Sequence, residues 1–140
     1  MRRTVLLVSL MTLVMLLTSG VALAKFISGT DGDDTLRGTK YADNIFANAG
    51  NDVVNGLKGN DSLTGGTGND KVYGGAGKDK ISGKNGEDEE YGGKGKDHIW
   101  SAGEERDVVD CGRGGKDVAE VDPLDQVVNC ERVEVVTPTP

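Results

Sequence analysis

Residues 56–73 read GLKGNDSLT followed by GGTGNDKVY, and these two nonapeptides share one pattern. Each has a glycine at its first and fourth positions, an aspartate at its sixth and an aliphatic residue at its eighth. The pattern continues in both directions, so that eight nonapeptides follow one another without a slip from Gly29 to Trp100. A fixed period of this kind predicts a repeat structure in which each unit packs on its neighbours. The sixth positions of the eight units are Asp34, Asp43, Asp52, Asp61, Asp70, Asp79, Asp88 and Asp97.

Each position of the nonapeptide has a physical task. A turn that contains glycines can adopt positive φ angles and bring backbone carbonyls inward. The three residues after each aspartate place one side chain inward and its two neighbours outward, as in a β-strand. Two nonapeptides then form one 18-residue coil, and stacked coils predict an all-β fold, a parallel β-roll or right-handed β solenoid. The inward residues are Leu36, Ile45, Val54, Leu63, Val72, Ile81 and Ile99, with Glu90 as the exception.

The composition agrees with such a fold and narrows the choice of partner. The chain has 140 residues, of which 22 are glycine and only 4% are aromatic. Aromatic residues supply much of the buried area of an ordinary core, so this composition argues against an ordinary globular enzyme. The net charge is −7, which argues against nucleic acid and anionic membranes as partners. Cations, and metal ions first among them, are the favoured partners.

The first 24 residues have the pattern of a secretory signal peptide. Arg2 and Arg3 precede a mostly apolar run over residues 5–17, and small residues follow up to the sequence Ala22-Leu23-Ala24. An A-x-A sequence at this place favours cleavage after Ala24 and export of the mature chain. The alternative is that the apolar run is retained as a membrane anchor.

The nonapeptides resemble the repeat G-G-x-G-x-D-x-U-x of the RTX, or haemolysin-type, calcium-binding family. The resemblance covers residues 29–100 and implies a parallel β-roll with Ca²⁺ between equivalent turns of adjacent coils. It makes all eight sixth-position aspartates metal ligands, with backbone carbonyls completing each oxygen shell. The implied pairs, and up to about six ions, are Asp34 with Asp52, Asp52 with Asp70, Asp70 with Asp88, Asp43 with Asp61, Asp61 with Asp79 and Asp79 with Asp97.

Elementary electrostatics points to the same kind of ion. Adjacent coils lie roughly 4.8 Å apart, so two columns of carboxylates repel each other unless a cation neutralises them. Seven inward aliphatic side chains are also a small core for 72 ordered residues. We therefore expect calcium binding and folding to be one event.

Two units depart from the pattern. Tyr41 replaces the fourth-position glycine, so we expect the turn shared by Asp43 and Asp61 to bind calcium poorly. Glu90 replaces the inward aliphatic residue, and we expect it to mark a degraded repeat, to distort the roll or to turn toward solvent or an ion. His98 is expected to be a surface residue and not a ligand. The ninth-position aromatics Phe46, Tyr73, Tyr91 and Trp100 are expected to point outward as scattered surface residues, with a carbohydrate- or partner-binding face as the alternative.

The C-terminal part of the sequence suggests a cap. After Trp100 the register slips by one residue, and weaker repeats place Asp107 and Asp117 where the aspartate series would continue. Cys111 and Cys130 are expected to form one disulfide in a secreted chain. The expected division is a signal peptide over 1–24, a calcium-binding β-roll over 25–100, degenerate repeats with a disulfide-stapled cap over 101–136, and a disordered tail over 137–140.

The sequence favours a non-enzymatic function. Outside the aspartate series it contains no H-E-x-x-H motif, no Ser-His-Asp set and no paired carboxylates. We therefore expect a secreted, extracellular calcium-binding repeat protein without an enzyme substrate or a nucleic-acid partner. Two alternatives stay open: an extracellular adhesin or surface-interaction module that uses the calcium-rigidified roll, and an accessory module of a secreted enzyme.

Overall fold

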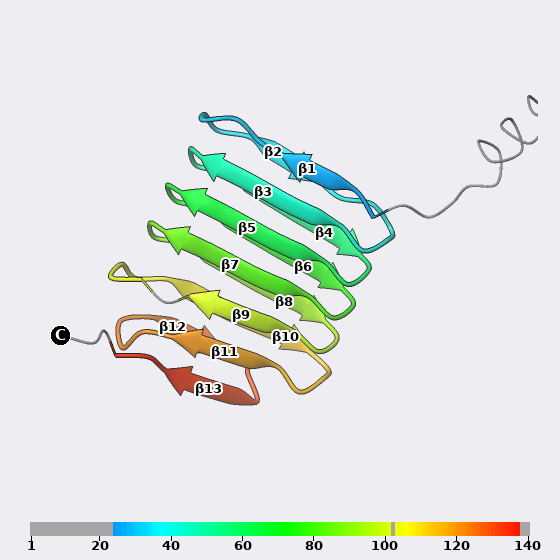
Figure 1. The fold of residues 1–140 in the computed structure, drawn as a ribbon. Helices are drawn as coiled ribbons and strands as arrows, with labels where there is room; N and C mark the ends of the chain where they lie inside the picture. The colour runs from blue at the N-terminus through cyan, green and yellow to red at the C-terminus, as the bar shows by residue number, and fades with distance from the viewer. Residues whose placement is uncertain (1–23, 102, 138–140) are drawn as a thin grey trace, which may run out of the picture.

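The computed structural model describes residues 24–101 and 103–137, and every regular element in this part of the chain is a β-strand (Figure 1). No helix among these residues is long and apolar enough to cross a membrane. The predicted signal peptide lies, apart from Ala24, outside the described residues, and so do the last three residues of the predicted tail.

The strands form two parallel sheets that face each other, and the coils stack in chain order (Figure 1). The predicted parallel β-solenoid is therefore confirmed. One sheet has the order β1-β3-β5-β7-β9-β11-β13, with bounds Phe26–Ser28, Asn44–Ala49, Ser62–Thr67, Lys80–Asn85, His98–Ser101, Val118–Val121 and Arg132–Val135. The other has the order β12-β10-β8-β6-β4-β2, with bounds Gln126–Val128, Val108–Arg113, Glu89–Lys94, Lys71–Ala76, Val53–Lys58 and Thr35–Arg37.

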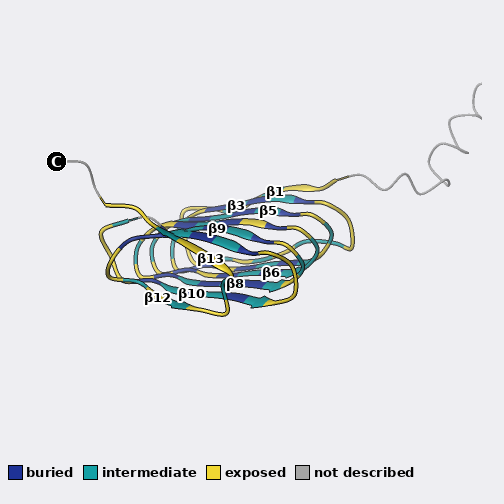
Figure 2. Ribbon diagram, turned by 90° about the horizontal axis from the view of Figure 1, so that it is seen from below, coloured by how far each residue is buried: buried dark blue, intermediate teal, exposed yellow. Residues whose placement is uncertain are grey.

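The pairing register repeats the period of the sequence. Residues 18 positions apart are paired through the repeat region, as in Val54 with Val72 and Leu63 with Ile81. Because side chains alternate across a strand, this register lines up the eighth-position residues of successive coils on the inner faces. They form the core between the two sheets, and Figure 2 shows buried positions in dark blue along the strands of both sheets. Ile45, Val54, Leu63, Val72, Ile81 and Ile99 are all buried.

The strands are longer than the three residues expected from the alternation. From β3 to β8 each has six residues, because pairing continues past the first-position glycine of the next unit. In β4 and β6, for example, Leu57 still pairs with Gly75 and Lys58 with Ala76. The turns are correspondingly tighter than a six-residue glycine loop.

Glu90 neither distorts the roll nor turns outward. It keeps its place between Val72 and Val109 in the register and is fully buried. Its Oε1 accepts the N–H of Gly83 at 2.5 Å, just beyond Ser82, the last residue of β7 that pairs with β9. The next coil holds one extra residue, which ends the β7–β9 pairing early. The side chain of Glu90 thus accepts the hydrogen bond that the N–H of Gly83 would otherwise donate to a neighbouring strand. Burial raises the pKa of Glu90 to about 8.

The outward aromatic residues lie on both sheets, and among Phe46, Tyr73, Tyr91 and Trp100 only the two tyrosines pair with each other. Tyr73 and Tyr91 are 18 residues apart and stack with ring centroids 4.9 Å apart. The ring centroids of His98 and Trp100 lie 3.8 Å apart, and Nε2 of His98 is 2.8 Å from Oε1 of Glu120. His98 is half-buried on the outer face of its sheet.

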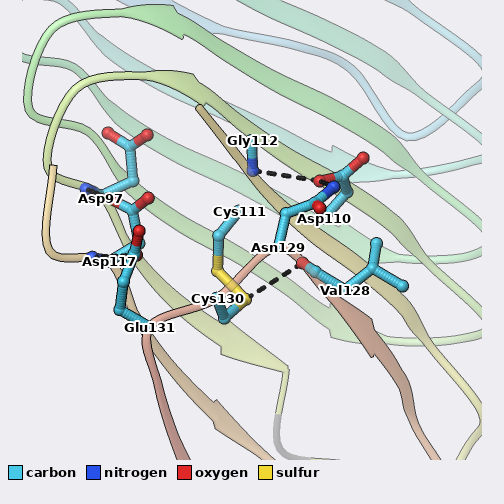
Figure 3. Close-up of a disulfide and its surroundings, with 9 residues drawn as sticks. All are labelled: Asp97, Asp110, Cys111, Gly112, Asp117, Val128, Asn129, Cys130 and Glu131. Atoms are coloured by element: carbon cyan, nitrogen blue, oxygen red, sulfur yellow. Dashed lines mark hydrogen bonds between the residues drawn. A yellow bond between two sulfur atoms is a disulfide. The ribbon is translucent and has the colours of Figure 1, made fainter. Parts of the chain in front are cut away.

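Strands β10 to β13 continue both sheets beyond the eight nonapeptides. The predicted disulfide joins Cys111, which is buried in β10, to Cys130, with their Cα atoms 5.0 Å apart (Figure 3). The bridge thus ties β10 to the loop between β12 and β13.

Candidate metal sites

The sixth-position aspartates join successive coils by hydrogen bonds from backbone to carboxylate. The N–H of Asp52 donates to Oδ1 of Asp70 at 2.8 Å, and the N–H of Asp61 donates to Oδ1 of Asp79 at the same distance. These hydrogen bonds link the aspartates 18 residues apart that the sequence predicts to share a metal site. The Asp34 column contains Asp34, Asp52, Asp70, Asp88, Asp107 and Asp125. The Asp43 column contains Asp43, Asp61, Asp79, Asp97 and Asp117, and ends on Glu131.

The second carboxylate oxygen of these aspartates is buried and has no hydrogen-bond donor. This holds for Oδ2 of Asp52, Asp61, Asp70, Asp79, Asp88, Asp97 and Asp117. A buried oxygen without a partner is costly, and a repeated set of them calls for a common explanation. One carboxylate oxygen therefore holds the neighbouring coil, while the other remains free to bind.

The free oxygens converge with backbone carbonyls beneath the first-position glycines. A Cβ atom placed on Gly74 would lie 2.7 Å from Oδ2 of Asp79 and 2.6 Å from the carbonyl oxygen of Gly92. On Gly56 it would lie 2.5 Å from Oδ2 of Asp61 and 2.6 Å from the carbonyl oxygen of Gly74. Two oxygen acceptors that lie close together repel each other, and hard Ca²⁺ prefers carboxylate and carbonyl oxygens of this kind. The donor set fits calcium.

The electrostatics of the two columns favours a cation as well. Burial raises the pKa of Asp61, Asp70, Asp79 and Asp97 to about 6, and that of Asp88 to about 7, and neighbouring carboxylates of the same column contribute. A divalent cation between the coils would reverse this effect, because it stabilises the ionised form.

The glycines of the repeat serve two different purposes. From Gly50 onward the fourth-position glycines have positive φ, for example 119° at Gly59 and 117° at Gly68, whereas Gly32 in the first unit does not. The first-position Gly74 needs no positive φ and is required because a side chain would fill the space beside Asp79. Tyr41, at a fourth position, does not adopt a positive φ, so the backbone of its turn differs from that of the later turns.

The first coil also differs in how its aspartates are bonded. The N–H groups of Thr30 and Thr39, at second positions, donate to Oδ2 of Asp34 at 2.6 Å and of Asp43 at 2.5 Å. From the next coil on, the second position takes a positive φ, and Oδ2 of the following aspartate is free. These second positions are Asn48, Leu57, Gly66, Gly75, Lys84 and Gly93.

A further set of bonds was not foreseen from the sequence. At the fifth position, the N–H of Asn69 donates to Oδ1 of Asn51 at 2.8 Å, and the N–H of Asn51 donates to Oδ1 of Asp33 at 2.7 Å. The recurrence of asparagine at positions 51, 60 and 69 is the signal that could have revealed these bonds. Asp125 follows Asp107 by 18 residues, the length of one coil, so its spacing could have revealed it. Glu131 follows Asp117 by only 14 residues and carries no such signal.

Within residues 24–101 and 103–137, no three His, Cys, Asp or Glu side chains lie close enough together to hold a metal ion by themselves. An ion at the turns would therefore depend on backbone carbonyls in addition to the paired aspartates. The expected ligand set, two aspartates and several carbonyls per site, has this composition.

Comparison with known proteins supports the same family. The model of the RTX calcium-binding nonapeptide repeat, which spans four copies of the repeat, matches residues 28–63 and again residues 55–90. No curated protein and no solved structure matches the chain. The matched segments contain most of the Asp34 and Asp43 columns, and their fold is the parallel solenoid described above. Residues 28–90 therefore consist of repeats of the RTX calcium-binding nonapeptide family.

Proposed function

We propose that this is a secreted, non-enzymatic calcium-binding protein whose roll folds as Ca²⁺ fills the turns between successive coils. The observation that carries the proposal is the convergence of a buried, unpartnered Oδ2 with a neighbouring carbonyl, which occurs at Gly56, Gly74 and Gly92 in the Asp43 column and at Gly65 in the Asp34 column. Calcium, when bound, supplies positive charge between oxygens that otherwise repel one another. The apolar run and A-x-A sequence over residues 1–24 support secretion.

The aspartates differ in how readily they would accept the ion. Both members of a pair have a free Oδ2 in Asp52 with Asp70, Asp70 with Asp88, Asp61 with Asp79 and Asp79 with Asp97. Asp97 with Asp117 adds a fifth pair of this kind. In the pairs that contain Asp34 or Asp43, threonine N–H groups already occupy one Oδ2. We therefore assign the strongest binding to the later coils and the weakest to the first coil, where Tyr41 also lies.

Coupling between binding and folding follows from the distribution of burial. The core between the sheets is one or two aliphatic residues deep in each coil, while each turn buries a carboxylate. Without a cation, every added coil places another buried carboxylate beside the last. With calcium, the same coil adds attraction between the ion and the carboxylates of adjacent coils. Ion binding and ordering of the coil then become one process.

Two measurements on the purified protein test this proposal. A calorimetric calcium titration gives the number of ions and the affinity, with about five sites expected from the pairs with free Oδ2 atoms. Far-UV circular dichroism in chelator and in excess calcium follows the fold. We expect the β signal to appear only with calcium. Failure to bind calcium at millimolar concentration would refute the function, and a β signal that survives chelation would refute the coupling.

A further inference from the structure

The two turn edges of the roll carry opposite charge. Alternate nonapeptides place their turns on opposite edges, because each coil consists of two of them. We call the turns 38–43, 56–61, 74–79, 92–97 and 112–117 the basic edge, and the turns 29–34, 47–52, 65–70, 83–88 and 103–107 the acidic edge. The net charge of −7 conceals this division.

In the five turns of the basic edge every exposed charged side chain is positive, and the exposed Glu131 lies beyond them, at the C-terminal end of the Asp43 column. Its exposed charges are Lys40, Lys58, Lys78, Lys94, Lys96, Arg113 and Lys116. Its acidic residues are the buried members of the Asp43 column and no others. The acidic edge, in contrast, exposes Asp31, Asp33, Glu87, Glu104 and Glu105, with only Lys84 and Arg106 as exposed cations.

The cations of the basic edge form two rows along the axis of the roll. Lys58, Ala76, Lys94 and Arg113 are successive partners in the pairing register, so three cations share one row. Lys78 and Lys96 occupy the fifth position of successive coils and form a second row that Lys116 extends. Within residues 24–101 and 103–137, none of the seven cations takes part in a salt bridge. The rows present repeated, uncompensated positive charge to solvent.

We infer that the basic edge of the calcium-loaded roll binds a linear acidic polysaccharide, with one of its anionic groups near each coil. This inference rests on the proposed function, because calcium in the Asp43 column would neutralise the aspartates that lie beneath these rows. A polymer fits the edge better than a single small anion, since the cations are spread over five turns and do not converge on one point.

The chemistry of the edge favours a polysaccharide over a nucleic acid. Six of the seven cations are lysines, which are hydrated point charges, whereas the planar fork of arginine suits bidentate recognition of phosphate. Proteins that bind single strands add aromatic platforms for the bases. Here the aromatic pairs lie on the sheet faces, and Tyr41 is the one aromatic residue in these five turns.

The test compares two triple variants that remove the same charge. The first carries Lys58→Gln, Lys78→Gln and Lys96→Gln on the basic edge, and the matched control carries Lys71→Gln, Lys80→Gln and Lys84→Gln elsewhere. Binding of fluorescent dextran sulfate is followed by anisotropy in calcium and in chelator, with neutral dextran and a DNA duplex as further probes. A third triple variant, Lys58→Arg, Lys78→Arg and Lys96→Arg, tests whether positive charge is sufficient for binding. Calcium titrations and circular dichroism are recorded for each protein without polysaccharide.

We expect the unmodified protein to bind dextran sulfate only with calcium and not to bind neutral dextran. The basic-edge triple should lose at least about tenfold in affinity, because cations close to a polyanion each contribute a severalfold factor. The control triple and the Lys→Arg triple should bind nearly as the unmodified protein does. Equal losses in both glutamine triples, binding unaffected by chelator, or tighter binding of the DNA duplex would overturn the inference. If calcium binds and the roll folds but dextran sulfate does not bind, this inference fails and the proposed function stands.

Discussion

The backbone N–H of Asp61 donates to Oδ1 of Asp79 at 2.8 Å, while Oδ2 of Asp79 faces the carbonyl oxygen of Gly92 without a donor. The two oxygens of one carboxylate therefore have separate roles, one in joining the coils and one in binding a cation. Substitutions that preserve the first role and remove the second can separate them experimentally.

The variant Asp79→Asn keeps Oδ1 and replaces Oδ2 with an amide donor that can face the Gly92 carbonyl. Without calcium we expect it to stabilise the roll by about 1 kcal/mol, the net worth of a new hydrogen bond. With calcium we expect a raised midpoint for calcium-induced folding and a loss of up to two ions, because Asp79 belongs to two pairs. Circular dichroism in chelator with sucrose as stabiliser, and in a calcium series, measures both effects.

The control for this experiment is Asp33→Asn, which removes the same charge from the acidic edge. Asp33 is exposed, and its Oδ1 accepts the N–H of Asn51 as an asparagine would. Its effect on stability should stay within about 0.5 kcal/mol. If the two variants behave alike in the presence and absence of calcium, the assignment of Oδ2 to the ion is wrong.

Gly74→Ala tests the space beneath a first-position glycine. The added methyl group would lie 2.6 Å from the carbonyl oxygen of Gly92 and 2.7 Å from Oδ2 of Asp79. We expect it to destabilise the calcium-loaded roll by roughly 1–3 kcal/mol, as overpacking does, and to weaken calcium binding in parallel. The matched control is Gly32→Ala, where the new Cβ has no neighbour within 4 Å. Denaturant unfolding in saturating calcium compares them, and equal destabilisation would contradict the steric account.

Glu90 gives the roll a pH dependence with a definite sign. Burial raises its pKa from 4.5 to about 8 in the folded protein. Its contribution to stability is therefore full below about pH 4.5 and is lost as the pH rises through about 8, at no more than about 1.4 kcal/mol per pH unit. Glu90→Gln keeps the acceptor for the N–H of Gly83 and removes the titration. The free energy of unfolding of this variant, relative to that of the unmodified protein, should therefore grow with pH.

Unfolding of both proteins in saturating calcium at pH 6, 7, 8 and 9 measures this difference. Because the metal-site aspartates are the same in the two proteins, the difference in stability reports Glu90 together with its repulsion by Asp88 and Asp107. A constant difference across this range would show that Glu90 does not titrate there.

The disulfide should stabilise the C-terminal coils by constraining the unfolded chain. Cys111 and Cys130 are 19 residues apart, a separation for which loop closure gives about 3 kcal/mol. The double variant Cys111→Ser, Cys130→Ser should lower the free energy of unfolding by about that amount, and its stability should not respond to reductant. Thermal unfolding with and without reductant tests this. If reduction leaves the unmodified protein as stable as before, the bridge does not contribute.

The nine-residue period was sufficient to predict much of this structure. Since side chains alternate and coils repeat every 18 residues, the sequence determined which aspartates share a column and which aliphatic residues, such as Val54 and Val72, meet in the core. The charge division between the two edges follows from the same period. A net charge summed over the whole chain conceals it.

Other features depend on backbone geometry that the period does not encode. The positive φ of Leu57 and Lys84, and the capture of Oδ2 by Thr30 and Thr39, depend on how each turn closes. The buried position of Glu90 depends on one extra residue in the following coil, which leaves the N–H of Gly83 in need of an acceptor. Sequence alone shows the departure at Glu90 but not what compensates for it.

The placement of alternate turns on opposite edges sets the size of the unit by which such a roll can lengthen. Insertion or deletion of one nonapeptide would keep the aspartate period intact. It would nevertheless carry every later turn to the other edge. A nonapeptide inserted between Glu87 and Lys96, for example, would place Lys96 on the side of Glu87, and the two charge classes would mix. A change of 18 residues leaves each turn on its own edge. For this protein, the segment that can be duplicated or lost with the surface preserved is the pair of nonapeptides, although the repeat visible in the sequence is half that length.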